Sequence, residues 1–321
     1  MGDVVRIEQR IAVEGGESGA SIAVRIIGPE AGRVAARPLV LFGFPGGGMT
    51  KAYFDLDAGE DRSFSFAEAM AARGHLTVAV DHLGVGASTR PDDGYRLTVE
   101  RVAAADAAAV AEVKRRLRGG LDGYVRLNAF SAVGVGHSMG AMITAWMQAH
   151  HASFDAIALL GAGPFGLQEY LPTRLKPLAG RPQAARDEIE AIMRASGAPP
   201  YGRMAASPEA RRLLKGGSEA GALALAKARG ELITVCGMFA MIPQSWAPEA
   251  AQICEPVLLG MGDQDLGERR AEGPGYFQGT SDLSTVLLLD TGHNHFVYES
   301  RGRLFAELAA WAETQAGRRC V

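Results

Sequence analysis

Ser138 stands in a sequence context that could turn its hydroxyl into a nucleophile. It lies within Gly136-His-Ser-Met-Gly140, after a run of small and apolar residues at 132–135 and before an apolar helical run at 141–149. A serine on a strained turn between strand and helix points its oxygen out of the sheet edge, and flanking glycines let the two elements approach without a clash. The free N–H groups of the helix N-terminus would stabilise a nearby oxyanion.

Two other interpretations of this turn remain open. Gly134, Gly136 and Gly140 are also close to the spacing of a dinucleotide-binding turn, which occupies the same place between a strand and a helix. Such a site requires an acidic residue at the end of the next strand, whereas the next apolar run, 156–160, ends in Gly161-Ala-Gly. The third interpretation is a tight turn whose serine has no chemical role.

A second glycine-rich segment, Pro45-Gly-Gly-Gly48, follows the nearly continuous apolar run 38–44. An uninterrupted apolar run of this length is typical of a buried central strand. Glycines directly after such a strand leave backbone N–H groups unshielded by side chains. The segment is therefore either a loop that donates hydrogen bonds to an anion or a flexible turn.

The elements around these two segments alternate between strand and helix. Residues 4–28 alternate apolar and polar side chains around Gly15-Gly16, which predicts two antiparallel strands. A strand-like run at 76–81 then lies between helical runs at 63–73 and 98–117. This alternation predicts an α/β protein with a parallel sheet and helices on both faces.

Three motifs in this order resemble the α/β-hydrolase fold superfamily, in particular serine esterases and lipases with a helical cap. They are Pro45-Gly-Gly-Gly, Asp81-His-Leu-Gly-Val-Gly-Ala-Ser88 and Gly136-His-Ser-Met-Gly140. The resemblance covers the first 160 residues, resumes near Cys254, and implies a mostly parallel central sheet flanked by helices. It also implies an oxyanion hole formed by the N–H groups of Gly47 and Met139, with Gly46 beside Gly47. Proline replaces the histidine that begins the family's H-G-G-G loop.

The alternation breaks within residues 164–250, which contain several prolines and helical patches at 183–195 and 207–215. In the family, an insertion after the sixth strand is usually a helical cap over the active site. The resemblance thus implies a hydrolase core at 1–163 and 251–321 and a cap at 164–250, with an extra packing domain as the alternative. Three apolar residues either line a substrate pocket or pack the interior of the cap: Phe165, Met238 and Phe239.

The resemblance also implies an acid and a histidine downstream of the serine, in the family's chain order. Asp263 and Asp265 both fit the G-x-x-D pattern after the next strand-like run, and the spacing from Pro256 favours Asp265, with Asp263 as the alternative. His293 directly follows a glycine after the last strand-like run, as the family's catalytic histidine usually does. His295 is its alternative, or a contact to the substrate or to the catalytic groups.

Composition and charge limit the class of protein. The chain has 321 residues, 47% of them hydrophobic, and a net charge of -3, which describes a soluble globular protein without the basic excess of a nucleic-acid binder. No run reaches membrane-spanning length and the N-terminal residues lack an apolar signal segment, so we expect a cytoplasmic protein. The 3 cysteines are widely spaced, which disfavours a disulfide framework, and no residue set has convincing zinc-ligand spacing.

Together these features predict a serine hydrolase that needs no metal or cofactor. We expect it to cleave a carboxylic ester of a small to medium hydrophobic molecule through an acyl-enzyme on Ser138. Its partner is a small-molecule substrate rather than nucleic acid or a membrane, and a homodimer is compatible with the sequence. The same constellation supports lactone, thioester, amide and C–C bond hydrolysis as well as acyl transfer. A non-catalytic protein that binds a small molecule in the same fold is the alternative from another class.

Overall fold

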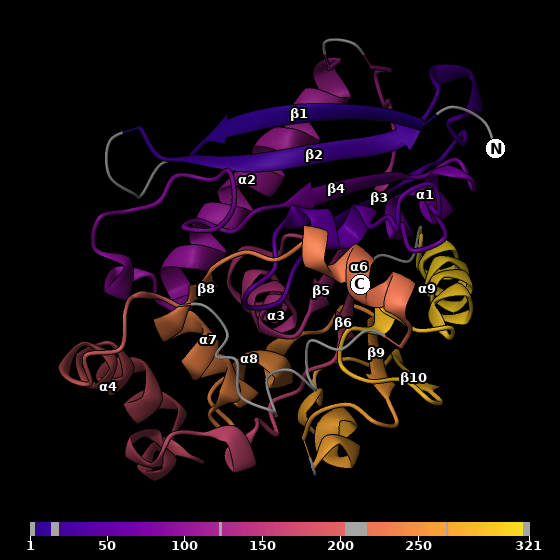
Figure 1. The fold of residues 1–321 in the computed structure, drawn as a ribbon. Helices are drawn as coiled ribbons and strands as arrows, with labels where there is room; N and C mark the ends of the chain where they lie inside the picture. The colour runs from indigo at the N-terminus through magenta and orange to yellow at the C-terminus, as the bar shows by residue number, and fades with distance from the viewer. Residues whose placement is uncertain (1–3, 14–18, 122–123, 203–216, 268, 317–321) are drawn as a thin grey trace.

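An eight-stranded sheet forms the centre of the molecule (Figure 1). The computed structural model describes residues 4–13, 19–121, 124–202, 217–267 and 269–316. The strand order is β1-β2-β4-β3-β5-β6-β9-β10. The strands are β1 (Val4–Ala12), β2 (Ser21–Pro29), β3 (Leu39–Phe44), β4 (Leu76–Val80), β5 (Ser131–His137), β6 (Ala156–Leu160), β9 (Val257–Gly262) and β10 (Leu283–Leu288). β2 is antiparallel to β1 and β4, and the other neighbours are parallel, which confirms the predicted α/β class.

Helices cover both faces of this sheet. The helices of the core are α1 (Phe66–Ala71), α2 (Val99–Gly119), α3 (Met139–His151) and α9 (Arg301–Gln315). Val40 and Phe42 of β3 belong to the buried cluster under α2 and α3, whereas Leu39 and Leu41 belong to the cluster under α1 and α9. Successive strand residues point to opposite faces, so a strand covered on both faces must be apolar throughout. This requirement accounts for the continuous apolar sequence of β3.

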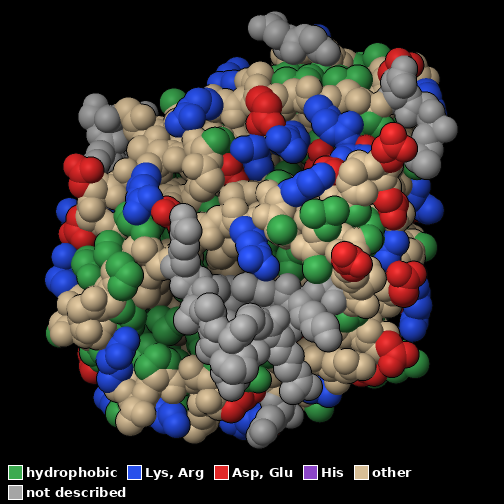
Figure 2. Space-filling model, in the orientation of Figure 1, with side chains coloured by type: hydrophobic (Ala, Val, Ile, Leu, Met, Phe, Trp, Pro, Cys, Tyr) green, Lys and Arg blue, Asp and Glu red, His purple; other side chains and the backbone are tan. Residues whose placement is uncertain are grey.

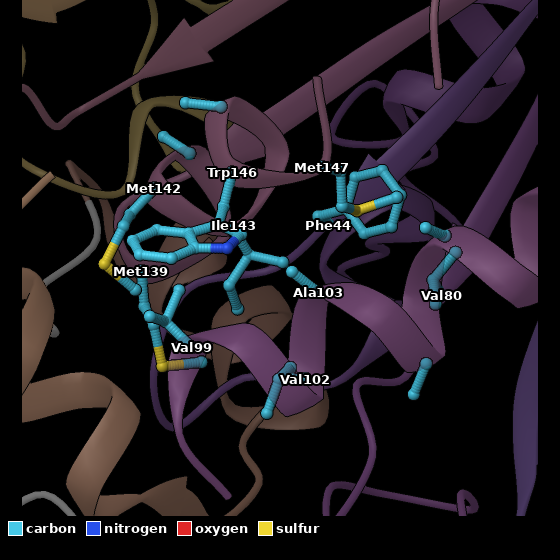
Figure 3. Packing of buried hydrophobic residues seen from close by; sticks show 14 of the residues in the cluster. Phe44, Val80, Val99, Val102, Ala103, Met139, Met142, Ile143, Trp146 and Met147 are labelled. Atoms are coloured by element: carbon cyan, nitrogen blue, oxygen red, sulfur yellow. The ribbon is translucent and has the colours of Figure 1, made fainter. Parts of the chain in front are cut away.

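Helix α3 begins at Met139, two residues earlier than the sequence predicted, and it packs on α2. Figure 3 shows Met139, Met142, Ile143 and Trp146 of α3 on the side that meets Val99, Val102 and Ala103 of α2. The α3 residues recur at i, i+3, i+4 and i+7, the spacing of one helix face. Because this face is buried from its first residue, the helix N-terminus is held directly against the end of β5.

The insertion between β6 and β9 is mainly helical. Apart from 3₁₀ turns, its described elements are α4 (Pro182–Ala195), β7 (Tyr201–Gly202), α6 (Glu219–Lys227), β8 (Leu232–Ile233), α7 (Thr234–Met241) and α8 (Ala247–Gln252). Helix α4 confirms the patch predicted at 183–195, whereas the patch at 207–215 lies outside the described residues, as does Gly15-Gly16. β7 and β8 form an antiparallel pair that alternation does not predict, because two residues are too few to show a period. Helices α7 and α8 pack on α3.

The carboxyl ends of β3, β5, β9 and β10 meet at one edge of the sheet. Phe44 at the end of β3 pairs with Gly136 of β5, and Gly262 at the end of β9 pairs with Leu288 of β10. The loops that leave these ends carry the glycine-rich segment, Ser138, Asp265 and His293. Ligands of open parallel sheets bind in the crevice at this edge, so the fold alone directs attention to these loops.

Candidate active site

The turn at Ser138 is strained and tightly packed. Ser138 has φ 53° and ψ -121°, a backbone conformation that residues with side chains rarely adopt. A Cβ atom at Gly140 would lie 2.1 Å from the Phe44 carbonyl oxygen, so only glycine lets the end of β3 approach the first turn of α3. The sharp turn places the Ser138 hydroxyl at the edge of the sheet instead of inside it.

Ser138, His293 and Asp265 form a continuous hydrogen-bonded chain. The Ser138 Oγ lies 2.9 Å from His293 Nε2, and His293 Nδ1 lies 2.7 Å from Asp265 Oδ1. An ionised carboxylate only accepts hydrogen bonds, so Nδ1 carries a proton and Nε2 is free to accept the serine proton. The arrangement can therefore move a proton from the hydroxyl to the imidazole while the carboxylate stabilises the positive charge that results.

The surroundings of Asp265 keep it ionised. Burial opposes its charge, but His293 and His295 outweigh burial and hold the pKa of the Asp265 carboxyl well below its usual range. The Leu266 N–H donates to Oδ1 at 2.7 Å, and the Gly262 N–H approaches Oδ2 at 3.4 Å. Both oxygens of the carboxylate are thus occupied by donors.

The alternative acid, Asp263, lies elsewhere. Its Oδ1 accepts a hydrogen bond from the Thr291 N–H at 3.0 Å, and this bond lowers the pKa of the Asp263 carboxyl. The Asp265 N–H donates to the Gly262 carbonyl in a tight turn that returns the chain under the end of β9. That turn brings Asp265, and not Asp263, to His293.

The alternative histidine, His295, contacts the same carboxylate but not Ser138. Its side chain is fully buried and its Nε2 donates to Asp265 Oδ2 at 2.7 Å. Its ring packs edge-on against His137, with ring centroids 5.7 Å apart. Asp265 is therefore shared by two histidines, of which only His293 reaches the serine.

His137, inside the elbow, supports the backbone of His293. Its Nε2 donates to the His293 carbonyl at 2.7 Å. Burial first, and then the neighbouring His293 and His295, lower the pKa of His137 well below its usual range, so this ring is neutral. Tyr53 stacks on its other side, with ring centroids 4.8 Å apart. The sequence reveals His137 only as the variable residue of the motif and gives no sign of this contact.

The glycine-rich segment lies directly against the elbow. A Cβ at Gly46 would be 3.0 Å from the Ser138 Cβ, and one at Gly47 would be 3.7 Å from the Met139 sulfur. Met139 is the first residue of α3, so its N–H is one of the donors that a helix leaves without an internal partner. The structure thus brings together Gly46, Gly47 and Met139, as the resemblance implied.

Part of the insertion contacts the glycine-rich segment. The Gly230 N–H donates to the Gly48 carbonyl, and the Thr50 N–H donates to the Ala228 carbonyl, each at 2.8 Å. Leu232 of β8 lies directly against Gly47, because its Cδ1 is 2.5 Å from the place that a Cβ of Gly47 would occupy. Leu232 lies within an apolar stretch of the sequence, and nothing in its spacing singles it out.

The three residues proposed to contact substrate occupy different environments. Phe239 is buried, with its ring edge-on to Trp146 at a centroid distance of 6.0 Å. Phe165 is also buried, against Gly163 and Gly267. Met238 keeps part of its surface exposed. Phe165 and Phe239 thus contribute to packing, and any role in binding a substrate stays a prediction.

Two features of the described residues concern metal ions and membranes. Within these ranges no group of three His, Cys, Asp or Glu side chains has the geometry to hold a metal ion. The helices that the structure describes include none that is long and apolar enough to cross a membrane.

Comparison with known proteins identifies the family. Residues 39–308 match the model of the alpha/beta hydrolase family. This match spans most of the sequence, and the chain belongs to the alpha/beta hydrolase family. No curated protein matches the sequence significantly.

Solved structures with the same fold differ in their activities. The chain is similar to an epoxide hydrolase from Vigna radiata, with a TM-score of 0.59 and 14% identity over 96% of this chain and 98% of that one. It is similar to the thioesterase domain of the curacin biosynthetic pathway, with a TM-score of 0.57 and 15% identity over 95% and 99% of the two chains. It is also similar to E-2-(acetamidomethylene)succinate hydrolase, with a TM-score of 0.58 and 18% identity over 96% and 100%. At such identities the likeness concerns the fold alone.

Proposed function

We propose that this protein is a serine hydrolase that cleaves a carboxylic ester of a small to medium hydrophobic molecule. The observation that carries the proposal is the unbroken chain from the Ser138 hydroxyl through His293 to the buried Asp265 carboxylate. A strained serine at the carboxyl end of a central strand, next to free helix N–H groups, supports the same chemistry.

In the first half of the reaction, the Ser138 Oγ attacks the carbonyl carbon of the ester while its proton moves to His293 Nε2. The C=O electron pair moves onto the oxygen, and the N–H groups of Gly47 and Met139 stabilise this oxyanion. When the pair returns, the bond to the alkoxide breaks and His293 gives its proton to the leaving alcohol. The acyl group remains on Ser138.

In the second half, a water molecule replaces the alcohol. His293 Nε2 takes a proton from the water as its oxygen attacks the acyl carbon, and the same N–H groups receive the second oxyanion. Collapse of this intermediate breaks the bond to Ser138, whose oxygen recovers the proton from His293. Asp265 stays ionised throughout and holds the proton of His293 on Nδ1.

The insertion at 164–250 supplies the cap in this proposal, and the flanking segments 1–163 and 251–321 supply the hydrolase core. The backbone hydrogen bonds of residues 228–230 to the glycine-rich segment support a cap that covers the oxyanion hole. The side chain that it brings near this place, Leu232, is apolar. An apolar cover favours a hydrophobic acyl or aromatic group over a charged one.

The proposal is tested with p-nitrophenyl esters from acetate to laurate, on wild type, Ser138→Ala and Ser131→Ala. Ser131 begins the same strand at its opposite end, so its substitution controls for changes to β5. We expect wild type and Ser131→Ala to turn over the esters, with an optimum in chain length, and Ser138→Ala to lose turnover.

Labelling with a fluorophosphonate separates the remaining outcomes. Labelling of Ser138 without ester turnover would move the assignment to lactone, thioester, amide or C–C bond substrates, because the nucleophile would still be activated. If wild type shows no labelling and no turnover, that result would contradict the proposal. It would favour a protein that binds a small molecule without converting it.

A further inference from the structure

A second buried histidine–carboxylate pair lies behind the glycine-rich segment, and the reaction proposed above does not use it. His82 follows β4 and Asp106 lies within α2, and neither side chain has any exposed surface. His82 Nδ1 is 2.5 Å from Asp106 Oδ2, and His82 Nε2 is 2.9 Å from the Pro45 carbonyl oxygen. The ring of His82 stacks on Phe44, with ring centroids 6.1 Å apart.

The two contacts of His82 fix where its protons are. The Pro45 carbonyl only accepts, so Nε2 carries a proton. A second proton lies between Nδ1 and Asp106, because two lone pairs at this distance would repel each other. Burial lowers the pKa of His82, but the charge and the hydrogen bond of Asp106, together with the hydrogen bond to Pro45, outweigh burial and raise it. Burial raises the pKa of Asp106. Both shifts favour retention of the shared proton, so His82 keeps donating to Pro45.

Stability alone does not account for a pair in this place. Replacing a buried ion pair by apolar side chains of similar volume is often neutral or stabilising. Asp106 Oδ1 lacks a hydrogen-bond partner within the described residues, which adds to the cost of burying the carboxylate. Among the described residues, the one group outside the pair that the ring of His82 holds by a hydrogen bond is the Pro45 carbonyl, at the start of the glycine-rich segment.

The Pro45 carbonyl controls the orientation of the next amide. The described residues contain no cis peptide bond, so the Pro45 C=O and the Gly46 N–H point in opposite directions from one rigid plane. A peptide plane next to glycines rotates easily because no Cβ restricts it. The hydrogen bond from His82 opposes this rotation on the Pro45 side, while Gly230 and Ala228 hold the far side at Gly48 and Thr50.

We propose that His82 and Asp106 are positioning residues for the oxyanion hole: together they hold the Pro45–Gly46 peptide plane so that the N–H groups of the glycine-rich segment stay directed for an oxyanion at Ser138. The inference rests on the proposed function, since it assigns this segment to oxyanion binding. Neither residue touches the substrate.

Variants of His82 separate the two hydrogen bonds. His82→Phe keeps a flat ring beside Phe44 and removes both bonds. In His82→Gln the amide nitrogen occupies about the place of Nε2 and can still donate to Pro45, whereas in His82→Asn it reaches only toward Asp106. Glu249→Gln is the matched control, because Glu249 is a buried carboxylate paired with Arg186, far from Pro45 along the chain and hydrogen-bonded to α3 and α4 instead.

The first readout is kcat and KM per active site, with sites counted by fluorophosphonate titration so that misfolded protein is excluded. We expect His82→Phe and His82→Asn to lower kcat by about 100-fold, as loss of an oxyanion donor does, with KM within about threefold of wild type. His82→Gln should recover to within about tenfold, and Glu249→Gln should match wild type. Wild-type kcat per site in both His82→Phe and His82→Asn would overturn the proposal.

The second readout is hydrogen exchange of the amides at 46–49, which needs no activity. We expect these amides to exchange faster in His82→Phe and His82→Asn than in wild type and His82→Gln. If wild type neither hydrolyses esters nor reacts with the fluorophosphonate, the proposed function fails, and exchange still decides whether His82 anchors the segment. Exchange at wild-type rates in His82→Phe or, if that variant does not fold, in His82→Asn would overturn the anchoring itself.

Discussion

Two histidine–carboxylate pairs lie at the edge where the parallel strands end, and they differ in what surrounds the carboxylate. Asp265 receives donors on both oxygens, from two histidines and from backbone N–H groups. Asp106 receives one donor, from His82, and its second oxygen has no hydrogen-bond partner among the described residues. The pKa of Asp265 is accordingly lowered, whereas burial raises that of Asp106.

This difference sets what each histidine can do. The Asp265 carboxylate accepts the proton on Nδ1 of His293 and leaves Nε2 facing the serine, so His293 can accept a proton from Ser138 and return it. Asp106 is poorly stabilised as an anion and shares a proton with His82 Nδ1, so His82 keeps its own proton on Nε2, donates it to the Pro45 carbonyl and serves as a fixed anchor. The number of hydrogen-bond donors around each carboxylate thus distinguishes His293, which can transfer a proton, from His82, which holds a backbone carbonyl in place.

Substitution of the two histidines gives the largest expected contrast. His293→Gln removes the proton acceptor of Ser138, and we expect kcat/KM for a p-nitrophenyl ester to fall by on the order of 10⁵-fold. The loss from His82→Phe is smaller by comparison, since the nucleophile and base remain. His151→Gln, an exposed histidine at the end of α3, is the control and should leave the rate unchanged. A loss of less than about tenfold in His293→Gln would remove this histidine from the mechanism.

The same change of carboxylate to amide should have unequal effects at the two acids. In Asp265→Asn the amide can hold the wrong tautomer of His293, and we expect kcat to fall by about 10⁴-fold. In Asp106→Asn the amide can donate to Nδ1 of a neutral His82. The ring then still donates its Nε2 proton to the Pro45 carbonyl, so we expect kcat to fall by less than about tenfold. Steady-state rates of the two variants test this, and Asp263→Asn should match wild type. Equal losses at Asp265 and Asp106 would contradict the comparison.

The sequence predicted one of these pairs and missed the other, for a physical reason. Motif order and the glycine before His293 pointed to Asp265 and His293, because a strand end followed by a tight turn leaves few ways to place a side chain. The spacing from Pro256 favoured Asp265 over Asp263, and the turn at Gly262 gives the physical reason, because it returns the Asp265 carboxylate under the sheet. The structure brings Asp265 to His293, and its catalytic role stays a prediction.

His82 and Asp106 lie 24 positions apart on different elements, and no local pattern joins them. The sequence nevertheless contains a pattern that predicts the burial of Asp106. Asp106 continues the apolar stripe of Val99, Val102 and Ala103 on α2 at helical spacing, so it had to be buried. A buried carboxylate needs a hydrogen-bonding or charged partner, so the helical spacing of Asp106 predicts such a partner on a neighbouring element. The insertion was harder, because helices of this kind show which faces are apolar but not what they cover.

His295 sharpens the comparison further, because it supplies the second histidine that Asp106 lacks. His295→Phe removes the donor to Oδ2 and leaves a buried charge less stabilised, so we expect the free energy of unfolding to fall by about 2 kcal/mol near neutral pH. The lowered pKa of the Asp265 carboxyl stabilises the folded state at pH values above the unfolded-state pKa of about 3.9. This contribution is lost as pH falls through the folded-state pKa. Because the unfolded pKa is the same in both proteins, the difference between wild type and variant should be full near pH 5 and shrink as pH falls through the folded pKa of Asp265 in the variant.

Denaturant unfolding from pH 3 to 7 measures this difference. The Asp265→Asn background is the control, because an amide cannot ionise and the acid-dependent part of the effect should vanish there. A difference between wild type and His295→Phe near pH 5 that is no larger than the same difference in the Asp265→Asn background would show that Asp265 gains nothing from its second histidine.

The smallest expected effect concerns the cover of the oxyanion hole. Leu232 reaches over Gly47, whereas Phe239 packs against Trp146 inside the α3 interface. Leu232→Ala should enlarge the space next to the oxyanion and shift the ester preference toward longer or branched acyl groups by about tenfold in relative kcat/KM, the scale of one or two methylenes. Phe239→Leu should lower stability and leave the preference unchanged. The ester series on both variants tests this assignment. A shift of the acyl-chain preference in Phe239→Leu alone would place the acyl group against α7 instead. The reason is that only a side chain in contact with the substrate can change the preference among esters without changing the nucleophile.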